Sequence, residues 1–401
     1  KNMFYFLKKL FLKNFKLADS VFKLLKLFPS FVAKNLINIL FLFPQKKSSF
    51  PHRLTIFLTD KCNMKCAHCF IIKEAPKKTI ELTTEDYKKL FKSLEGKTSQ
   101  ILFTGGEPTL RKDFYEILYS CYHDGGVSTA SIFSNALYPD KTSDLIKKVL
   151  ETTNLNIHFH TSIDGNEAFH DDNRKVKGSY EKVVQTIKLI NELEKKYKNR
   201  LSRVVVNVSI SKMNKDHLAD VVNTFKNLNC LFGLGFTREN NKVLNIDSKY
   251  ITQDLGVEEL RQDGSEKFKN SFLTIEEMKK IYNDLGGMIW DKDNDQLIYA
   301  FQKASMKGRI MFEESETSPI STECGMGYDD LVILTNGKIA RCEMLKPSLS
   351  LYDFDLNLKK LINSEENKNY LKKTSGCFCE HECATSVTAM SDKKLLKSFF
   401  A

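Results

Sequence analysis

Three cysteines constrain this chain more than any other feature of its sequence. Cys62, Cys66 and Cys69 form a Cys-x3-Cys-x2-Cys loop directly after the apolar run 53–58. Thiolates are preferred ligands of iron-sulfur centres, and a short loop that leaves a strand can point three of them at one cluster. A cubane of four irons held by three thiolates keeps one iron without a protein ligand. The sequence therefore predicts an iron-sulfur cluster on which a small chelating molecule can bind and be reduced.

A structural zinc site is the alternative interpretation of the same loop. Such a site is closed by four protein ligands. His68 also lies in the loop, but its position beside Cys69 makes it a poor fourth ligand. The cluster with an open iron is therefore the favoured interpretation.

After Pro51 the chain alternates short β-branched or aromatic runs with helical patterns, as a barrel of parallel strands does. The predicted strands are 54–58, 101–104, 129–133, 156–162, 204–210 and 231–236, and the predicted helices between them are 83–94, 114–123, 143–150, 179–196 and 215–228. Six such units predict an α/β fold, a partial (β/α)6 TIM-like barrel over residues 51–236. Its active site is expected at the carboxyl ends of the strands.

Short polar motifs follow the predicted strand ends. Gly105-Gly106-Glu107-Pro108 follows the second strand, Ser134-Asn135 the third, and Ser162-Ile163-Asp164-Gly165 the fourth. Taken singly, each is an ordinary turn sequence. Their order after the cysteine loop makes them candidates for one shared site.

In order and position these segments resemble the radical S-adenosylmethionine (radical SAM) superfamily. The likeness covers roughly residues 53–235 and includes His170-Asp171 with Arg174 and Gly178-Ser179-Tyr180. It implies a 4Fe-4S cluster on Cys62, Cys66 and Cys69, and S-adenosylmethionine, which an external donor such as flavodoxin or ferredoxin helps to cleave to methionine and a 5'-deoxyadenosyl radical. The cofactor-binding residues that it implies are Gly105, Gly106, Glu107, Pro108, Ser134, Asn135, Ser162 and Asp164.

A second group of cysteines lies near the end of the chain. Its members are Cys324, Cys342, Cys377, Cys379 and Cys383. Asn336-Gly337 between two apolar runs predicts a hairpin that brings Cys324 and Cys342 together. A zinc knot that includes His381 satisfies the same spacing, so the metal stays open on local grounds.

This region resembles the SPASM and Twitch extensions of radical SAM enzymes. Twelve residues separate Cys324 from Gly337 and four separate Gly337 from Cys342, as in the opening pattern of that domain. A full SPASM domain has seven cysteines, whereas five occur here, which implies one auxiliary 4Fe-4S cluster. Cys324 and Cys342 are its safest ligands, and the spare thiol among the last three is not identified. We expect this domain over residues 311–401, after a polar loop and bridging helices over 237–310.

The resemblance implies a radical SAM oxidoreductase that abstracts hydrogen from its substrate and passes an electron to the auxiliary cluster. A sugar, another small molecule or a lipid-linked group is the favoured substrate. The alternative is a peptide-modifying maturase that forms crosslinks or thioethers. A zinc-stabilised binding module is the non-enzymatic alternative.

The amino-terminal extension, residues 1–50, carries most of the net charge. Residues 1–48 hold ten lysines against the single Asp19, a net charge of +9 out of +11 for the whole chain. Apolar residues at helical spacing predict a basic amphipathic helix, and no run reaches the roughly 20 apolar residues that a membrane span needs. The helix either binds an anionic membrane or a carrier protein, or packs on the barrel. Nucleic-acid binding is not expected.

Cysteine usage also bears on location. Of the ten cysteines, only Cys121 and Cys230 stand apart from the two groups, and both are predicted core residues. Such clustering favours metal centres in a reducing compartment. We expect a cytoplasmic protein, at the inner face of the membrane if the helix binds lipid.

His158 and His160 face one side of the fourth strand, either toward the barrel interior or within the core.

Overall fold

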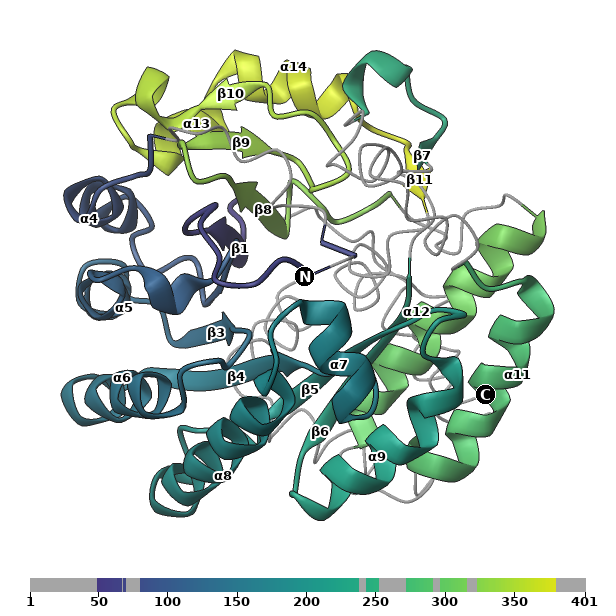
Figure 1. The fold of residues 1–401 in the computed structure, drawn as a ribbon. Helices are drawn as coiled ribbons and strands as arrows, with labels where there is room; N and C mark the ends of the chain where they lie inside the picture. Colours follow the sequence, from purple (N-terminus) through teal and green to yellow (C-terminus); the bar gives the residue numbers. More distant parts are fainter. Residues whose placement is uncertain are drawn as a thin grey trace, which may run out of the picture.

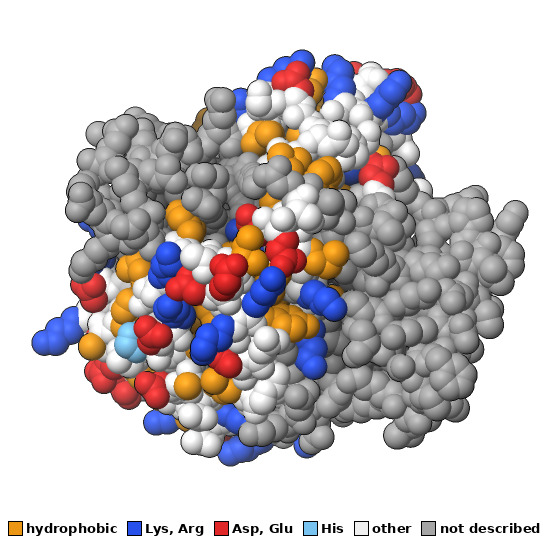
Figure 2. Space-filling model, turned by 90° about the vertical axis from the view of Figure 1, so that its right-hand side faces the viewer, with side chains coloured by type: hydrophobic (Ala, Val, Ile, Leu, Met, Phe, Trp, Pro, Cys, Tyr) orange, Lys and Arg blue, Asp and Glu red, His pale blue; other side chains and the backbone are white. Residues whose placement is uncertain are grey.

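The computed structural model describes residues 49–66, 68–69, 80–237, 243–251, 272–290, 296–315 and 323–379. The predicted amphipathic helix, His381 and Cys383 lie outside these residues. None of the helices in the described part combines the length and apolarity that a bilayer crossing needs. On the face shown in Figure 2, basic and acidic side chains of the described residues are interspersed.

A sheet of nine strands organises the part of the chain that the structure describes (Figure 1). Its order is β10-β9-β8-β1-β2-β3-β4-β5-β6, and the strands from β8 to β6 run parallel. The strands are β1 Arg53–Phe57, β2 Gln100–Thr104, β3 Thr129–Phe133, β4 Asn156–Ser162, β5 Val205–Ile210, β6 Leu231–Phe236, β8 Asp330–Ile333, β9 Lys338–Ala340 and β10 Leu349–Ser350. The mixed α/β fold with a partial TIM-like barrel is confirmed, and all six predicted strands occur within one residue of their expected ends.

Helices connect the parallel strands and lie along the outside of the curved sheet (Figure 1). They are α4 Thr84–Lys92, α5 Phe114–His123, α6 Pro139–Thr152, α8 Ser179–Tyr197, α9 Leu218–Asn227, α11 Ile275–Leu285 and α12 Gln296–Ser315. Helix α7 Glu167–Arg174 lies between β4 and α8 in the chain, and α13 Leu358–Asn363 and α14 Glu365–Lys373 follow β10. Thr83 caps α4 in a capping box with Asp86. Helix α6 begins earlier than predicted because Pro139 suits a first helical turn. Helix α7 was not predicted.

Alternation along each strand separates the core from the barrel interior. On β4, Ile157 and Phe159 are fully buried in the core that the helices share. The half-buried side chains of Asn156, His158, His160 and Ser162 occupy the opposite face, toward the interior. Cys121 and Cys230 are both buried in the main core, as predicted.

The predicted hairpin forms, and it joins the barrel sheet. Strands β8 and β9 are antiparallel, with Val332 opposite Ala340, and β8 pairs in parallel with β1. Arg53 Nε donates to Asp330 Oδ2 at 2.7 Å, and Thr55 Oγ1 donates to the same atom at 3.2 Å. Because Asp330 is buried, this charge-assisted contact fixes the hairpin beside the first barrel strand.

A candidate cofactor site at the carboxyl ends of the strands

The cysteine loop leaves the carboxyl end of β1. Cys66 is buried and Cys62 and Cys69 are half-buried. Burial, together with the nearby Glu107, Cys66 and Cys69, raises the pKa of Cys62 to about 11. Burial also raises the pKa of Cys66. The three thiols therefore lie close enough to influence one another, and three soft sulfur ligands on one loop suit an iron-sulfur cluster.

The turn after β2 lies against the start of this loop. Gly106 N donates to Thr59 O at 2.6 Å, and Glu107 N donates to Lys61 O at 2.8 Å. A Cβ at Gly106 would stand 2.1 Å from Lys61 O, and one at Gly105, where φ is +128°, would stand 2.5 Å from Thr59 O. Only glycine permits this approach of two backbones. The predicted Gly-Gly-Glu-Pro turn and the cysteine loop are thus one packed unit.

Glu107 joins the turn to the end of β3. Its fully buried carboxylate accepts hydrogen bonds from Thr109 N at 3.0 Å, Thr109 Oγ1 at 2.7 Å, Ser134 Oγ at 2.9 Å and Asn135 N at 2.7 Å. Burial raises the pKa of Glu107, although these bonds oppose the rise. Pro108 begins the short 3-10 turn η2, Pro108–Leu110.

Asn135 extends this contact to the cysteines. Its Nδ2 donates to Asn63 Oδ1 at 2.7 Å and lies 3.8 Å from Cys62 Sγ. The predicted residues Gly105, Gly106, Glu107, Pro108, Ser134 and Asn135 are therefore brought together around the loop.

Asp164 is held by an arginine of α7. Arg174 Nε and Nη2 donate to Asp164 Oδ2 and Oδ1 at 2.6 and 2.7 Å, and Asn173 Nδ2 donates to Oδ2 at 2.8 Å. Burial by itself would raise the pKa of Asp164, but the charge of Arg174 outweighs it and the net pKa is well below its usual range. Both carboxylate oxygens are thus engaged in a bidentate ion pair.

The same arginine reaches the cysteine loop. Arg174 Nη1 lies 3.6 Å from Cys66 Sγ, and Arg174 O accepts a hydrogen bond from Lys65 N at 3.4 Å. Asn173 Nδ2 is 2.9 Å from His68 Nδ1. Arg174 thus places a positive charge beside a predicted ligand, a role that the sequence analysis did not assign. The only sequence feature that pointed to this role was the position of Arg174 shortly after Asp164.

Asp171 fixes the connection from α7 to α8. It accepts hydrogen bonds from Gly178 N at 2.5 Å, Ser179 Oγ at 2.9 Å and Tyr180 N at 2.8 Å. These bonds hold the amino terminus of α8 against α7, and so they position Arg174.

Ser162 ends β4 and lies on the interior face of the barrel. It is opposite Asn207 of β5, which is in turn opposite Gly233 of β6. His160 stacks on Phe133, with ring centroids 4.3 Å apart. Burial lowers the pKa of His158 to about 4; burial and the neighbouring His158 lower that of His160 to about 3. Both imidazoles are therefore neutral at pH 7.

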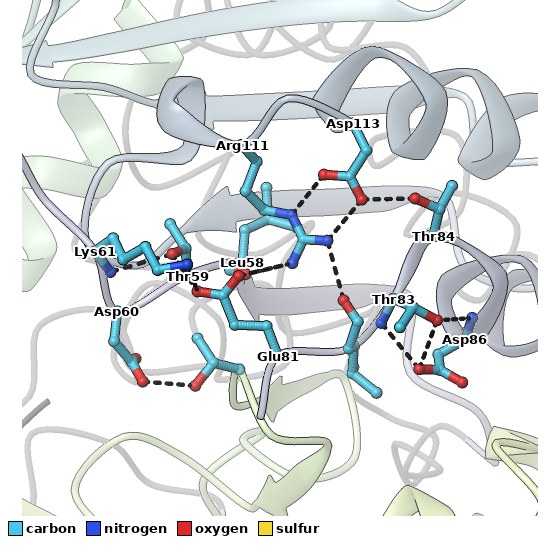
Figure 3. A network of polar contacts seen from close by, with 12 residues as sticks. Leu58, Thr59, Asp60, Lys61, Glu81, Thr83, Thr84, Asp86, Arg111 and Asp113 are labelled. Carbon is cyan, nitrogen blue, oxygen red and sulfur yellow. Dashed lines mark hydrogen bonds and ion pairs between the residues drawn. The ribbon is translucent and has the colours of Figure 1, made fainter. Parts of the chain in front are cut away.

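Arg111 anchors both ends of the segment that carries the cysteines (Figure 3). Its Nη1 donates to Leu58 O at 2.9 Å, before the loop, and its Nη2 donates to Leu82 O at 3.0 Å, after it. Asp113 holds the guanidinium with bonds of 2.9 and 2.7 Å, while Glu81 accepts from Thr59 Oγ1 at 2.6 Å. This network was not predicted, because arginine and aspartate at these positions give no local sequence signal.

The second cysteine group gathers beside the hairpin. Cys324 and Cys342 are buried in a small apolar cluster with Phe57 and Val332, and the half-buried Cys377 and Cys379 pack against it. Burial raises the pKa of Cys342 strongly, and Cys379, Cys324 and Cys377 raise it further. Four of the five predicted thiols thus converge. Within the described ranges, no three His, Cys, Asp or Glu side chains form a ready metal-ion site.

Residues 56–225 match the family model described as "Radical SAM superfamily". Among curated proteins, the sporulation killing factor maturation protein SkfB of Bacillus subtilis (strain 168) is 27% identical over 215 residues, which are 51% of this chain and 49% of SkfB. The chain therefore spans about half the length of SkfB. GTP 3',8-cyclase of Clostridium botulinum (strain Hall) is 22% identical over 325 residues, 80% of this chain and 89% of that protein.

Solved structures share the fold. SuiB of Streptococcus suis bound to S-adenosylmethionine aligns with a TM-score of 0.54 and 15% identity, over 81% of this chain and 68% of SuiB. The protein anSMEcpe with bound AdoMet aligns with a TM-score of 0.53 and 18% identity, over 80% of this chain and 83% of that one.

Proposed function

We propose that this chain, whose residues 56–225 match the radical SAM superfamily model, is a radical SAM oxidoreductase with one auxiliary cluster. The observation that carries the proposal is the convergence of three strand ends on one loop of three thiols. Asn135, which is bonded to Glu107, lies beside Cys62, and Arg174, which is paired with Asp164, lies beside Cys66.

The residues present fit a 4Fe-4S cluster on Cys62, Cys66 and Cys69. A cluster held there would supply the electron for the cleavage of S-adenosylmethionine, which initiates hydrogen abstraction from the substrate. The chain orients the loop: Gly106 allows the close backbone contact, and Arg174 compensates negative charge at Cys66. Gly105, Gly106, Glu107, Pro108, Ser134, Asn135, Ser162 and Asp164 remain the proposed cofactor-binding residues.

Ligands for the auxiliary cluster are drawn from the second cysteine group, with Cys324 and Cys342 as fixed members and two of Cys377, Cys379 and Cys383 completing the set. A cluster closed by four thiolates offers no open iron for substrate and supplies an electron acceptor. Loss of one hydrogen atom and one further electron, with a proton released, amounts to a two-electron oxidation of the substrate. An external flavodoxin or ferredoxin supplies the electron for the first cluster.

Two substrate classes are in competition. A sugar, small molecule or lipid-linked group is the first, and peptide maturation is the second candidate. One observation favours the peptide: the 27% identity to SkfB, which is a maturation protein. Residues 1–48, as a basic amphipathic helix, would carry a membrane or carrier contact of a cytoplasmic enzyme.

The proposal is tested with the double variant Cys324→Ala, Cys342→Ala. We expect this variant still to form 5'-deoxyadenosine from S-adenosylmethionine but to yield no oxidised product. The matched control is Cys121→Ala with Cys230→Ala, which removes two core thiols outside both groups. Oxidised product at the level of the parent would contradict the role of the second group.

The substrate class needs a separate assay. Extract from the source cells is separated by size, and each fraction is added to the enzyme while 5'-deoxyadenosine formation is followed above its substrate-free rate. A peptide substrate predicts stimulation that protease treatment of the fraction removes. Stimulation that survives the protease supports a sugar, small molecule or lipid-linked group.

A further inference from the structure

Arg341 is a buried arginine beside the second cysteine group, directly after strand β9. It directly precedes Cys342, and its side chain is only 1% exposed. Burying a guanidinium costs much of its hydration free energy, so such a charge is normally compensated nearby. The contacts of Arg341 show how this is arranged.

One side of the guanidinium holds the segment that carries Cys324. Arg341 Nε donates to Met326 O at 2.7 Å, and Nη2 donates to Cys324 O at 3.3 Å. Nη2 also lies 3.3 Å from Glu323 Oε1. The backbone on both sides of Cys324 is thereby tied to the residue that precedes Cys342.

The other side holds the segment that leads to Cys377. Arg341 Nη1 donates to Leu371 O at 3.4 Å, to Thr374 Oγ1 at 3.3 Å and to Thr374 O. These acceptors lie at the end of α14, just before Cys377. One side chain therefore joins all three segments from which the thiols converge.

Gly327 makes room for this side chain. A Cβ at Gly327 would stand 2.6 Å from Arg341 Cγ and 2.7 Å from Leu371 Cδ2, and its φ of +86° also favours glycine. The loop after Cys324 is thus shaped to accept a buried arginine.

The charge balance points to the thiols. Most acceptors of Arg341 are neutral carbonyl or hydroxyl oxygens, and the carboxylate of Glu323 is 24% exposed. A partly solvated carboxylate compensates a buried charge weakly. Four thiolates around one centre would supply the missing negative charge.

We propose that Arg341 is a positioning residue of the second cluster, which aligns the Cys324 and Cys377 segments and raises the reduction potential of the cluster through its charge. This inference rests on the proposed function, because it requires a cluster at these thiols.

The experiment uses the full chain with Cys62→Ala, Cys66→Ala and Cys69→Ala, so that only the second cluster can assemble. Into this parent are placed Arg341→Gln, Arg341→Lys and Glu323→Gln. Arg309→Gln is the matched control, since Arg309 is a buried arginine paired with the partly exposed Glu313 outside the cysteine group. Iron content and the midpoint potential, followed by electron paramagnetic resonance, are measured after anaerobic reconstitution.

Arg341→Gln is expected to make the ratio of reduced to oxidised cluster at a fixed potential at least tenfold smaller, a shift of about 59 mV for a one-electron couple. Arg341→Lys keeps the charge and is expected to restore most of the potential, with less iron bound. Glu323→Gln removes a nearby negative charge and is expected to shift the potential the opposite way. This variant at the partly exposed position tests the charge effect even if Arg341→Gln fails to fold.

An unchanged potential in both Arg341→Gln and Glu323→Gln would overturn the inference while leaving the proposed function standing. A loss of iron in Arg309→Gln equal to the loss in Arg341→Gln would overturn the positioning role, because the removal of any buried arginine would then have the same effect. A parent without iron would instead contradict the proposed function, and the inference with it.

Discussion

The hydroxyl of Thr335 donates a hydrogen bond to Asp60 Oδ2 at 3.0 Å. Asp60 lies two residues before the first cysteine of the loop, and Thr335 lies in the turn between β8 and β9, whose strands separate Cys324 from Cys342. The same threonine also makes a backbone hydrogen bond on the far side of the cysteine loop, where Leu82 N donates to Thr335 O at 2.9 Å. The two cysteine groups are therefore joined through hydrogen bonds as well as through the shared sheet.

A double-mutant cycle tests this joint. Asp60→Ala and Thr335→Val are each expected to lower the free energy of unfolding, and the interaction energy between them is expected to be about 0.5–1.5 kcal/mol, typical of a side-chain hydrogen bond. Urea unfolding of the apoprotein measures it. Additive effects of the two substitutions would contradict a direct contact.

Arg174 is expected to be sensitive to substitution even by similar residues. Arg174→Gln leaves the buried Asp164 without its charge partner, so the free energy of unfolding should fall by about 3–5 kcal/mol at pH 7. Arg174→Lys keeps the charge but loses the bidentate geometry, and should fall between wild type and Arg174→Gln. Urea unfolding is again the measurement.

Acid titration supplies the control for this pair. The folded-state pKa of Asp164 lies below its unfolded value, so its contribution is complete above about pH 4 and is lost as pH falls toward the folded pKa. The stability difference between wild type and Arg174→Gln should therefore shrink in acid. A difference that does not depend on pH would contradict the ion pair as its source.

Gly106→Ala tests the contact between the two loops. The added Cβ would meet Lys61 O, so the cysteine loop must move, and we expect weaker iron binding together with a loss of about 1–3 kcal/mol of stability. Gly287→Ala is the matched control, because a Cβ there meets nothing within 4 Å. Iron content after reconstitution and thermal unfolding report the two effects. Equal behaviour of the two variants would show that the close approach is unimportant.

The interior histidines predict loss of stability in mild acid. His158 and His160 have folded pKa values of about 4 and about 3, below the unfolded value of about 6.5. Their contribution is therefore complete above about pH 6.5 and is lost as pH falls toward the folded values, about 1–2 kcal/mol for each histidine between pH 7.5 and 5.

Replacement of His160 separates its contribution from that of other groups. His160→Phe should flatten the pH dependence of urea unfolding over this range, whereas substitution of the exposed His123 should leave it unchanged. A pH profile of His160→Phe that matches wild type would contradict the burial of a neutral imidazole at this position.

The sequence predicted what local patterns determine. Strand β4 shows strict alternation and β6 lies between clear breaks, so their ends were found within a residue. The pairing of β8 with β1 could not be found, because Arg53 and Asp330 lie 277 residues apart and nothing local signals their contact.

In the candidate site, too, some residues could be predicted from local sequence patterns and others could not. Its cysteines and glycines carry recognisable spacing. Arg111, Arg174 and Arg341 are ordinary charged residues in the sequence, and their importance comes from burial against distant segments. Helix α7 was overlooked because its eight residues are too polar to show helical periodicity.

The central claim is that the two cysteine groups hold two iron-sulfur clusters, one of which cleaves S-adenosylmethionine. The most direct measurement is iron and sulfide per chain after anaerobic reconstitution, followed by 5'-deoxyadenosine formation with a strong reductant. We predict about eight irons with 5'-deoxyadenosine for the wild type, and about four irons without it when Cys62, Cys66 and Cys69 are replaced by alanine. Zinc in place of iron, with no cleavage of S-adenosylmethionine, would contradict the account.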